Sequence, residues 1–64
     1  MKNNIQQLRK AINLSQEELA SRTDVSRQTI NSIETGKFDP SLPLVFKLLK
    51  TLDVSLEELF IFED

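Results

Sequence analysis

The stretch Ser15–Gly36, SQEELASRTDVSRQTINSIETG, decides how this 64-residue chain folds. Ser15 is followed three residues later by Glu18, the spacing of a capping box, in which each side chain bonds the backbone N–H of the other residue. Ser26 is the second expected helix cap. Only residues 23–25 remain between the two expected helices, and so short a link requires a sharp turn, as in a helix-turn-helix. The expected helices are 16–22 and 26–34.

The second of these helices carries a row of polar side chains. At about 100° per residue, Ser26, Ile30 and Ile33 fall on one side of it. The opposite arc holds side chains that can hydrogen-bond and are not acidic, namely Arg27, Gln28, Asn31 and Ser32. Because arginine and glutamine pair bidentately with guanine and adenine edges, we take this face as the candidate base-contacting surface. An ordinary solvated face is the alternative, and the caps and turn in front of it favour DNA.

The chain from Ser15 to Leu42 resembles the helix-turn-helix of the lambda-repressor/Cro-like family, also called the xenobiotic-response-element family of bacterial and phage regulators. The resemblance covers Ile5 to Phe60 and implies an all-α, compact five-helix domain, with residues 1–64 as a single DNA-binding domain and the motif in its second and third helices. The matching positions are the opening Gln16, the small Ala20, the apolar Leu19, Val25, Ile30 and Ile33, and the ending Glu34, Gly36 and Lys37.

Two positions depart from the family pattern where glycine is usual, and both hold aspartate. They are Asp24 in the turn and Asp53 later in the chain; Thr23 also replaces a usually apolar residue. Aspartate tolerates a left-handed backbone conformation better than most residues but less well than glycine. We therefore expect a left-handed Asp24 and a gain in stability from its replacement by glycine.

An arginine lies on the apolar stripe of the first expected helix, about residues 4–13. The stripe is formed by Ile5, Leu8 and Ile12, and Arg9 falls between them. A guanidinium there needs a partner, and Glu34, beside the inward side of the base-contacting helix, is the candidate. The resemblance implies the same structural ion pair. Two independent solvated charges are the alternative.

The resemblance also implies contacts to DNA phosphates from outside the base-contacting face. A glutamine at a helix start suits this role, because free N–H groups at a helix N-terminus bind anions. The loop after residue 34 and the start of the next helix are expected on the DNA backbone, with Phe38 in the core. The candidate phosphate contacts are Gln16, Ser26, Thr35, Lys37 and Ser41.

The C-terminal third has more apolar residues than one small core needs. In the expected helix 42–52 we place Val45, Leu48, Leu49 and Leu52 inward. The core then has no place for Leu42, Leu44 and Phe46. A second capping box, Ser55 to Glu58, opens a last helix that ends at Leu59 or Phe60. An exposed apolar cluster on a small domain marks an interface. We expect these residues to form a dimer surface. It consists of Leu59, Phe60, Ile61 and Phe62, together with Phe46 or Leu44.

The resemblance implies homodimers on two-fold symmetric sites, and such isologous contacts are common. Ile61 and Phe62 are candidates for a short extended segment that pairs across the two-fold axis. A tail folded back on its own core is the alternative.

Composition limits the other classes of function. Cysteine and histidine are absent, which removes the commonest metal ligands and acid–base groups. We expect no enzyme, no metal and no cofactor. No stretch has the roughly 20 apolar residues of a membrane span, and no signal peptide opens the chain, so a cytoplasmic location with no membrane partner is expected.

The charges are unevenly distributed along the chain. The net charge is −2, yet residues 1–52 hold all eight Lys and Arg against five acids, giving +3. Five acids lie in the last twelve residues. We expect the acidic end to face away from DNA.

The leading hypothesis is a sequence-specific regulator of transcription, a repressor, that binds double-stranded DNA as a homodimer with its third helix in the major groove. A second hypothesis adds an unidentified protein partner, as in an antitoxin or the controller of a restriction system. A third is a helical interaction module that does not bind DNA.

Overall fold

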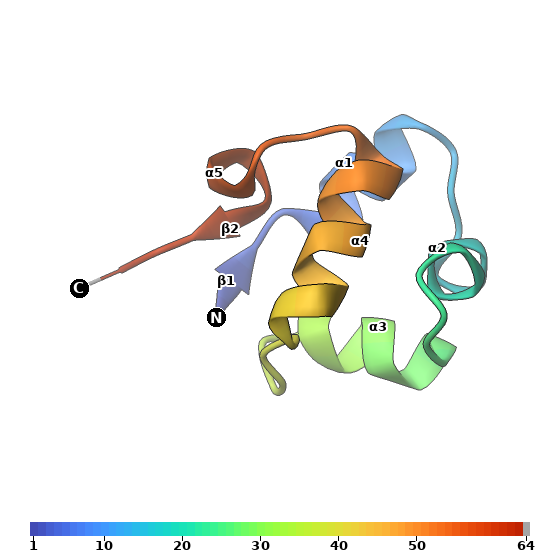
Figure 1. The fold of residues 1–64 in the computed structure, drawn as a ribbon, viewed down its shortest axis with the longest axis horizontal. Helices are drawn as coiled ribbons and strands as arrows, with labels where there is room; N and C mark the ends of the chain where they lie inside the picture. The colour runs from blue at the N-terminus through green and yellow to red at the C-terminus, as the bar shows by residue number, and fades with distance from the viewer. Residues whose placement is uncertain (64) are drawn as a thin grey trace.

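The computed structural model describes residues 1–63, and its five helices confirm the predicted all-α class. A small two-stranded ribbon, which was not predicted, joins the ends of the chain (Figure 1). The elements are β1 Lys2–Asn3, α1 Ile5–Ala11, α2 Gln16–Arg22, α3 Arg27–Glu34, α4 Leu42–Leu52, α5 Leu56–Leu59 and β2 Phe60–Ile61.

The helix α1 is shorter than expected at both ends. It stops at Ala11, and Asn13 adopts a left-handed conformation with φ of 60°. The N–H of Leu14 then reaches back to the carbonyl of Arg9, 2.8 Å away. An asparagine in this conformation ends a helix in the way that glycine commonly does.

Serine caps position the other four helices. The Oγ of each cap accepts the backbone N–H three residues on, in the pairs Ser15–Glu18, Ser26–Thr29, Ser41–Leu44 and Ser55–Glu58. At Ser15 and Ser55 the glutamate also accepts the N–H of its serine, at 3.0 Å and 2.8 Å, so both predicted capping boxes are present. These bonds to the carboxylate hold the pKa of Glu18 and of Glu58 below the usual range.

The two capping boxes predict a dependence of stability on pH. A lowered pKa in the folded state stabilises the fold above the ordinary value near 4.5, and this contribution is lost as the pH falls through the lowered pKa. We expect the melting temperature to fall less between about pH 6 and about pH 3 in the double variant Glu18→Gln/Glu58→Gln than in the wild type. Glutamine can still cap, so only ionisation changes. Glu17→Gln is the matched control and should follow the wild type; equal slopes in all three proteins would contradict the prediction.

The core lies between α1, α4 and α5 on one side and the α2–α3 pair on the other. The side chains that are almost completely buried include Ile5, Leu19, Ile30, Ile33, Leu48 and Leu59. The threonine in place of an apolar residue is accommodated because the Thr23 hydroxyl donates to the carbonyl of Leu19, 2.8 Å away. No buried side-chain polar atom in the described part of the chain lacks a hydrogen-bond partner.

Four apolar residues are not where the sequence predicted. Ile12, expected on the apolar stripe of the first helix, follows the end of α1 and is 48% exposed. Leu59 and Leu44, expected at a dimer surface, are 0% and 6% exposed and belong to the core of the protomer. The buried residues of α4 are Leu44, Leu48 and Leu52, and Leu49 packs against the core, so the predicted face is confirmed except that Leu44 is buried where Val45 was expected. Phe38, expected in the core, is 51% exposed.

The C-terminal strand pairs within its own chain. Lys2 lies opposite Ile61 and Asn3 opposite Phe60 in the antiparallel ribbon, and the N–H of Asn4 donates to the carbonyl of Leu59 at 2.8 Å. An extended segment is present at Phe60–Ile61, one residue before the expected Ile61 and Phe62, and it pairs with β1 of the same chain, as in the alternative of a tail folded back on its own protomer. Within residues 1–63, none of the helices combines the length and hydrophobicity needed to cross a bilayer.

The turn of the motif contains the expected left-handed aspartate, with φ of 60° at Asp24. Asp24→Gly should therefore raise stability by about 0.5–1 kcal/mol, roughly 2–8 °C in melting temperature. The exposed contact of Asp24 with Lys47, 3.5 Å long, contributes little. Asp24→Asn, which keeps the tolerance for this conformation and removes the charge, should melt close to the wild type. A glycine variant that melts at or below the wild-type temperature would contradict this account.

Candidate nucleic-acid interface

The helix α3 presents its polar row to solvent. Its first turn is fixed by the Ser26 cap, and its apolar side is anchored by the buried Ile30 and Ile33. Of the predicted base-contacting residues, Arg27, Gln28 and Asn31 are exposed and Ser32 is half-buried. The turn and the cap therefore set the direction in which these four side chains point.

A buried ion pair lies directly behind this face. Arg9 of α1 donates from Nε to Glu34 Oε2 at 2.6 Å and from Nη2 to Glu34 Oε1 at 3.1 Å. Its Nη1 also donates to the carbonyl of Leu14 at 3.3 Å. The two side chains are only 8% and 5% exposed. The hydrogen bonds to Glu34 raise the pKa of Arg9 despite burial, so the structure contains the ion pair that the sequence suggested.

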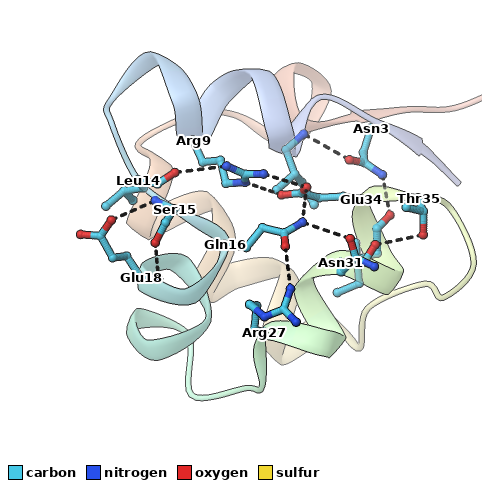
Figure 2. A network of polar contacts seen from close by, with 12 residues as sticks. Asn3, Arg9, Leu14, Ser15, Gln16, Glu18, Arg27, Asn31, Glu34 and Thr35 are labelled. Carbon is cyan, nitrogen blue, oxygen red and sulfur yellow. Dashed lines mark hydrogen bonds and ion pairs between the residues drawn. The ribbon is translucent and has the colours of Figure 1, made fainter.

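Gln16 connects this buried pair to the polar face (Figure 2). Its Nε2 donates to Glu34 Oε1 at 2.9 Å and to Asn31 Oδ1 at 3.2 Å. Its Oε1 accepts a longer bond of 3.4 Å from Arg27 Nη1. The Gln16 side chain thus contacts both Arg27 and Asn31, which lie one turn apart on the polar face of α3. The sequence suggested Gln16 only as a phosphate contact, and this bridging role was missed.

The other candidate phosphate contacts lie around the same face. Gln16 begins α2, Ser26 precedes α3, and Thr35 and Lys37 follow α3. Ser26, Thr35, Lys37 and Ser41 are exposed, whereas Gln16 is half-buried. The Thr35 hydroxyl donates to the carbonyl of Asn31 at 2.9 Å, which leaves its oxygen free to accept. Gln16, Ser26, Thr35 and Lys37 therefore lie at or next to the ends of the two motif helices, and Ser41 caps α4 after the following loop.

Asn3 is a positioning residue that the sequence did not reveal. Its Nδ2 donates to the carbonyl of Ile33 at 2.9 Å, and its Oδ1 accepts the N–H of Ile5 at 3.1 Å. It thereby ties β1 to the end of α3 (Figure 2). Its position before a helix resembled an ordinary turn, so no sequence signal distinguished it. Among residues 1–63, no three His, Cys, Asp or Glu side chains are grouped closely enough to hold a metal ion.

Comparison with known proteins identifies the family. The family model described as helix-turn-helix matches residues 5–59 of this chain. The chain belongs to the lambda-repressor/Cro-like helix-turn-helix family. Its helix-turn-helix is α2 and α3, with Asp24 in the turn between them.

The relatives of this helix-turn-helix protein include archaeal and bacterial regulators. An uncharacterised HTH-type transcriptional regulator of Methanocaldococcus jannaschii is 53% identical over 64 residues, covering 100% of this chain and 97% of that protein. The regulator YgzD of Bacillus subtilis is 39% identical over 64 residues, covering 100% and 97%. The restriction-modification controller protein C.AhdI from Aeromonas hydrophila has a TM-score of 0.81 at 37% identity, over 89% of this chain and 86% of that one. As a member of this helix-turn-helix family, the chain is a DNA-binding transcriptional regulator.

Proposed function

We propose that this regulator is a repressor that binds a two-fold symmetric operator as a homodimer, with α3 of each protomer in the major groove. The observation that carries the proposal is the exposed row on α3, backed by a buried ion pair and held by Gln16. Side chains that read base edges must be held in register, and Gln16 contacts two of the four, Asn31 and Arg27, before DNA binds.

The proposed contacts divide into base and phosphate contacts. Arg27 donates to guanine O6 and N7, and Gln28 pairs with adenine N6 and N7, while Asn31 and Ser32 reach inner bases or water. The phosphate contacts come from the rim of the face and position the protein on the duplex. They are Gln16, Ser26, Thr35, Lys37 and Ser41. Both amide hydrogens of Gln16 already have acceptors, so its side chain exchanges one bond to reach a phosphate.

The dimer surface that we propose differs from the predicted one, because Leu59 and Leu44 are buried in the protomer. An apolar groove runs between the start of α4 and the segment from α5 to Phe62, lined mainly by Leu42, Val45, Leu56, Phe60 and Phe62. Leu42 and Phe62 are 66% and 79% exposed, and Phe46 lies one turn beyond Leu42 on α4. Ile61 does not line this groove and lies instead in a separate hollow with Met1, Lys2, Phe62 and Glu63. A second copy that packs its own groove here removes this apolar surface from water on both protomers.

The place of this groove suits a two-fold operator. The helix α3 ends beneath the start of α4, on the side where α5 and β2 lie (Figure 1). Two protomers joined through the groove therefore point the ends of their α3 helices toward the two-fold axis.

Selection of bound sequences from a random double-stranded DNA pool, near physiological salt, tests the function. Salt is held fixed because the affinity of phosphate contacts depends on it. We expect an enriched inverted repeat whose half-sites lie about one helical turn apart. A pool without enrichment, from a protein whose helical content and cooperative melting are intact, would contradict the proposal and favour an interaction module that does not bind DNA.

The dimer surface has its own test. Leu42→Asp places a charge in the proposed interface, and we expect it to convert a sedimenting dimer into a monomer. An acidic residue in the first turn of α4 suits the helix dipole, so the protomer should remain folded. Ile12→Asp changes an exposed residue that directly follows α1 and does not line the groove, and it is the matched control. A Leu42→Asp protein that sediments as a dimer would show that the interface lies elsewhere.

The similarity to C.AhdI favours a second candidate, control of a restriction-modification system. A controller and a repressor share the operator and dimer geometry proposed above, so the DNA selection supports both. Searching the promoters that contain the selected repeat separates them. A repeat upstream of methyltransferase or endonuclease genes would support the controller.

A further inference from the structure

Phe38 is an exposed aromatic residue beside the base-contacting face. It follows α3 in the loop before α4, and its side chain is 51% exposed. Together with Ser26, Gln28, Thr29 and Ser32 it lines a hollow of about 260 Å³ on the surface of α3. Every other residue of this hollow lies at the start of α3 or on it, and Gln28 and Ser32 belong to the polar row.

The loop holds Phe38 in a fixed place. The N–H groups of Lys37 and Phe38 both donate to the carbonyl of Ser32, at 2.9 Å and 3.2 Å. Gly36, with φ of 78°, turns the chain and donates to the carbonyl of Ile33 at 3.0 Å. The backbone of Phe38 is therefore fastened to the last turn of α3. An aromatic side chain held in water at such a position is available to an apolar partner.

The chemistry of the hollow matches the major-groove edge of an A·T pair. The Gln28 amide offers a donor and an acceptor, the pattern that pairs with adenine N7 and N6. The thymine of the same pair presents a C5-methyl group in the same groove. Phe38 provides a large apolar wall next to that amide. The hollow is many times larger than the roughly 30 Å³ of a water molecule, so a methyl group fits.

We propose that Phe38 is a specificity-determining residue that packs against a thymine C5-methyl group in each half-site of the operator. This inference rests on the proposed DNA-binding function, and it identifies one further contact, between Phe38 and a thymine. The exposed Leu42, Leu56 and Phe62 line the groove assigned to the dimer, whereas Phe38 is not part of that groove.

Replacement of single thymines by deoxyuridine, which lacks only the methyl group, tests the contact. Each thymine of the selected operator is replaced symmetrically in both half-sites, and the affinity is measured for the wild type, Phe38→Ala and Phe38→Leu. At one thymine the wild type should lose about fourfold per half-site, the value of one buried methyl group. Phe38→Ala should bind the thymine and deoxyuridine operators equally, and Phe38→Leu should retain part of the discrimination.

The controls separate this contact from other causes. Ile12→Ala, which removes an exposed apolar side chain far from α3, should discriminate as the wild type does. If Phe38→Ala weakens binding equally to both operators while the loss on methyl removal persists, the ring contacts the sugar–phosphate backbone and the inference is wrong. It is also wrong if Phe38→Ala binds as the wild type does. Failure to select any operator would overturn the proposed function, and this inference with it.

Discussion

Glu34→Leu should lower the free energy of unfolding by about 3–5 kcal/mol, because it leaves the Arg9 guanidinium buried without its main partner. A chain of 64 residues has a total stability on the order of 3–10 kcal/mol, so this one change removes a large part of it. Arg9→Met should have a similar effect, because the Glu34 carboxylate then keeps only its bond from Gln16. Urea unfolding measures both losses.

The double variant Arg9→Met/Glu34→Leu distinguishes a coupled pair from two independent charges. Apolar residues of similar volume replace a buried pair at little cost, so the double variant should lose much less stability than the two single losses together. Lys10→Met, an exposed neighbour on α1, should have a small effect and is the control. Losses that simply add would mean that the two charges are independent.

The double variant should also bind DNA more weakly than the wild type under conditions in which both proteins are fully folded. Without Glu34, the Gln16 amide loses its 2.9 Å bond to the buried carboxylate, and Asn31 and Arg27 lose the support that Gln16 gives them. A double variant that is folded and binds with wild-type affinity would show that this support has no role in recognition.

Arg27→Ala should cost about 1–3 kcal/mol in each half-site, or about 2–6 kcal/mol for a dimer on a symmetric operator. The loss should be confined to operators that carry the preferred base opposite Arg27, and the variant should discriminate less at that position. Repeating the random-pool selection with Arg27→Ala measures both effects. Unchanged discrimination at every position would place Arg27 outside the base contacts.

Lys37→Ala provides the contrast, because a phosphate contact carries no sequence information. This variant should weaken binding to all operators alike. The slope of log affinity against log salt should become less steep by roughly 2, for one phosphate per protomer. A sequence-dependent loss in Lys37→Ala would assign the residue to a base instead.

The features that could be predicted from the sequence depend on neighbours in the chain. The caps Ser15, Ser26 and Ser55 were located, because a cap is a bond between residues three apart. The left-handed Asp24 followed from the family pattern, and the partner of Arg9 followed from the apolar stripe of the first helix together with that pattern. The polar row on α3 followed from helical periodicity alone.

The features that could not be predicted depend on packing between distant segments. The helix α4 is apolar on more than one stripe, so its sequence does not determine its rotation, and Leu44 took the place expected for Val45. The strands β1 and β2 have two residues each, too few to show an alternating pattern. Phe38 lies in a loop, where periodicity gives no information about burial, and the bridging bonds of Gln16 join two helices.

The bonds that run from Glu34 through Gln16 to Asn31 and Arg27 have a consequence for the kinetics of operator search. The bonds of Gln16 to Glu34 and Asn31, 2.9 Å and 3.2 Å long, restrict the Gln16 and Asn31 side chains before DNA binds, so less of their conformational entropy remains to be lost at the operator. Recognition then needs only local exchanges of hydrogen bonds, such as that of Gln16 to a phosphate. The association rate should therefore depend on diffusion to and along DNA, and should vary with ionic strength more than with operator sequence.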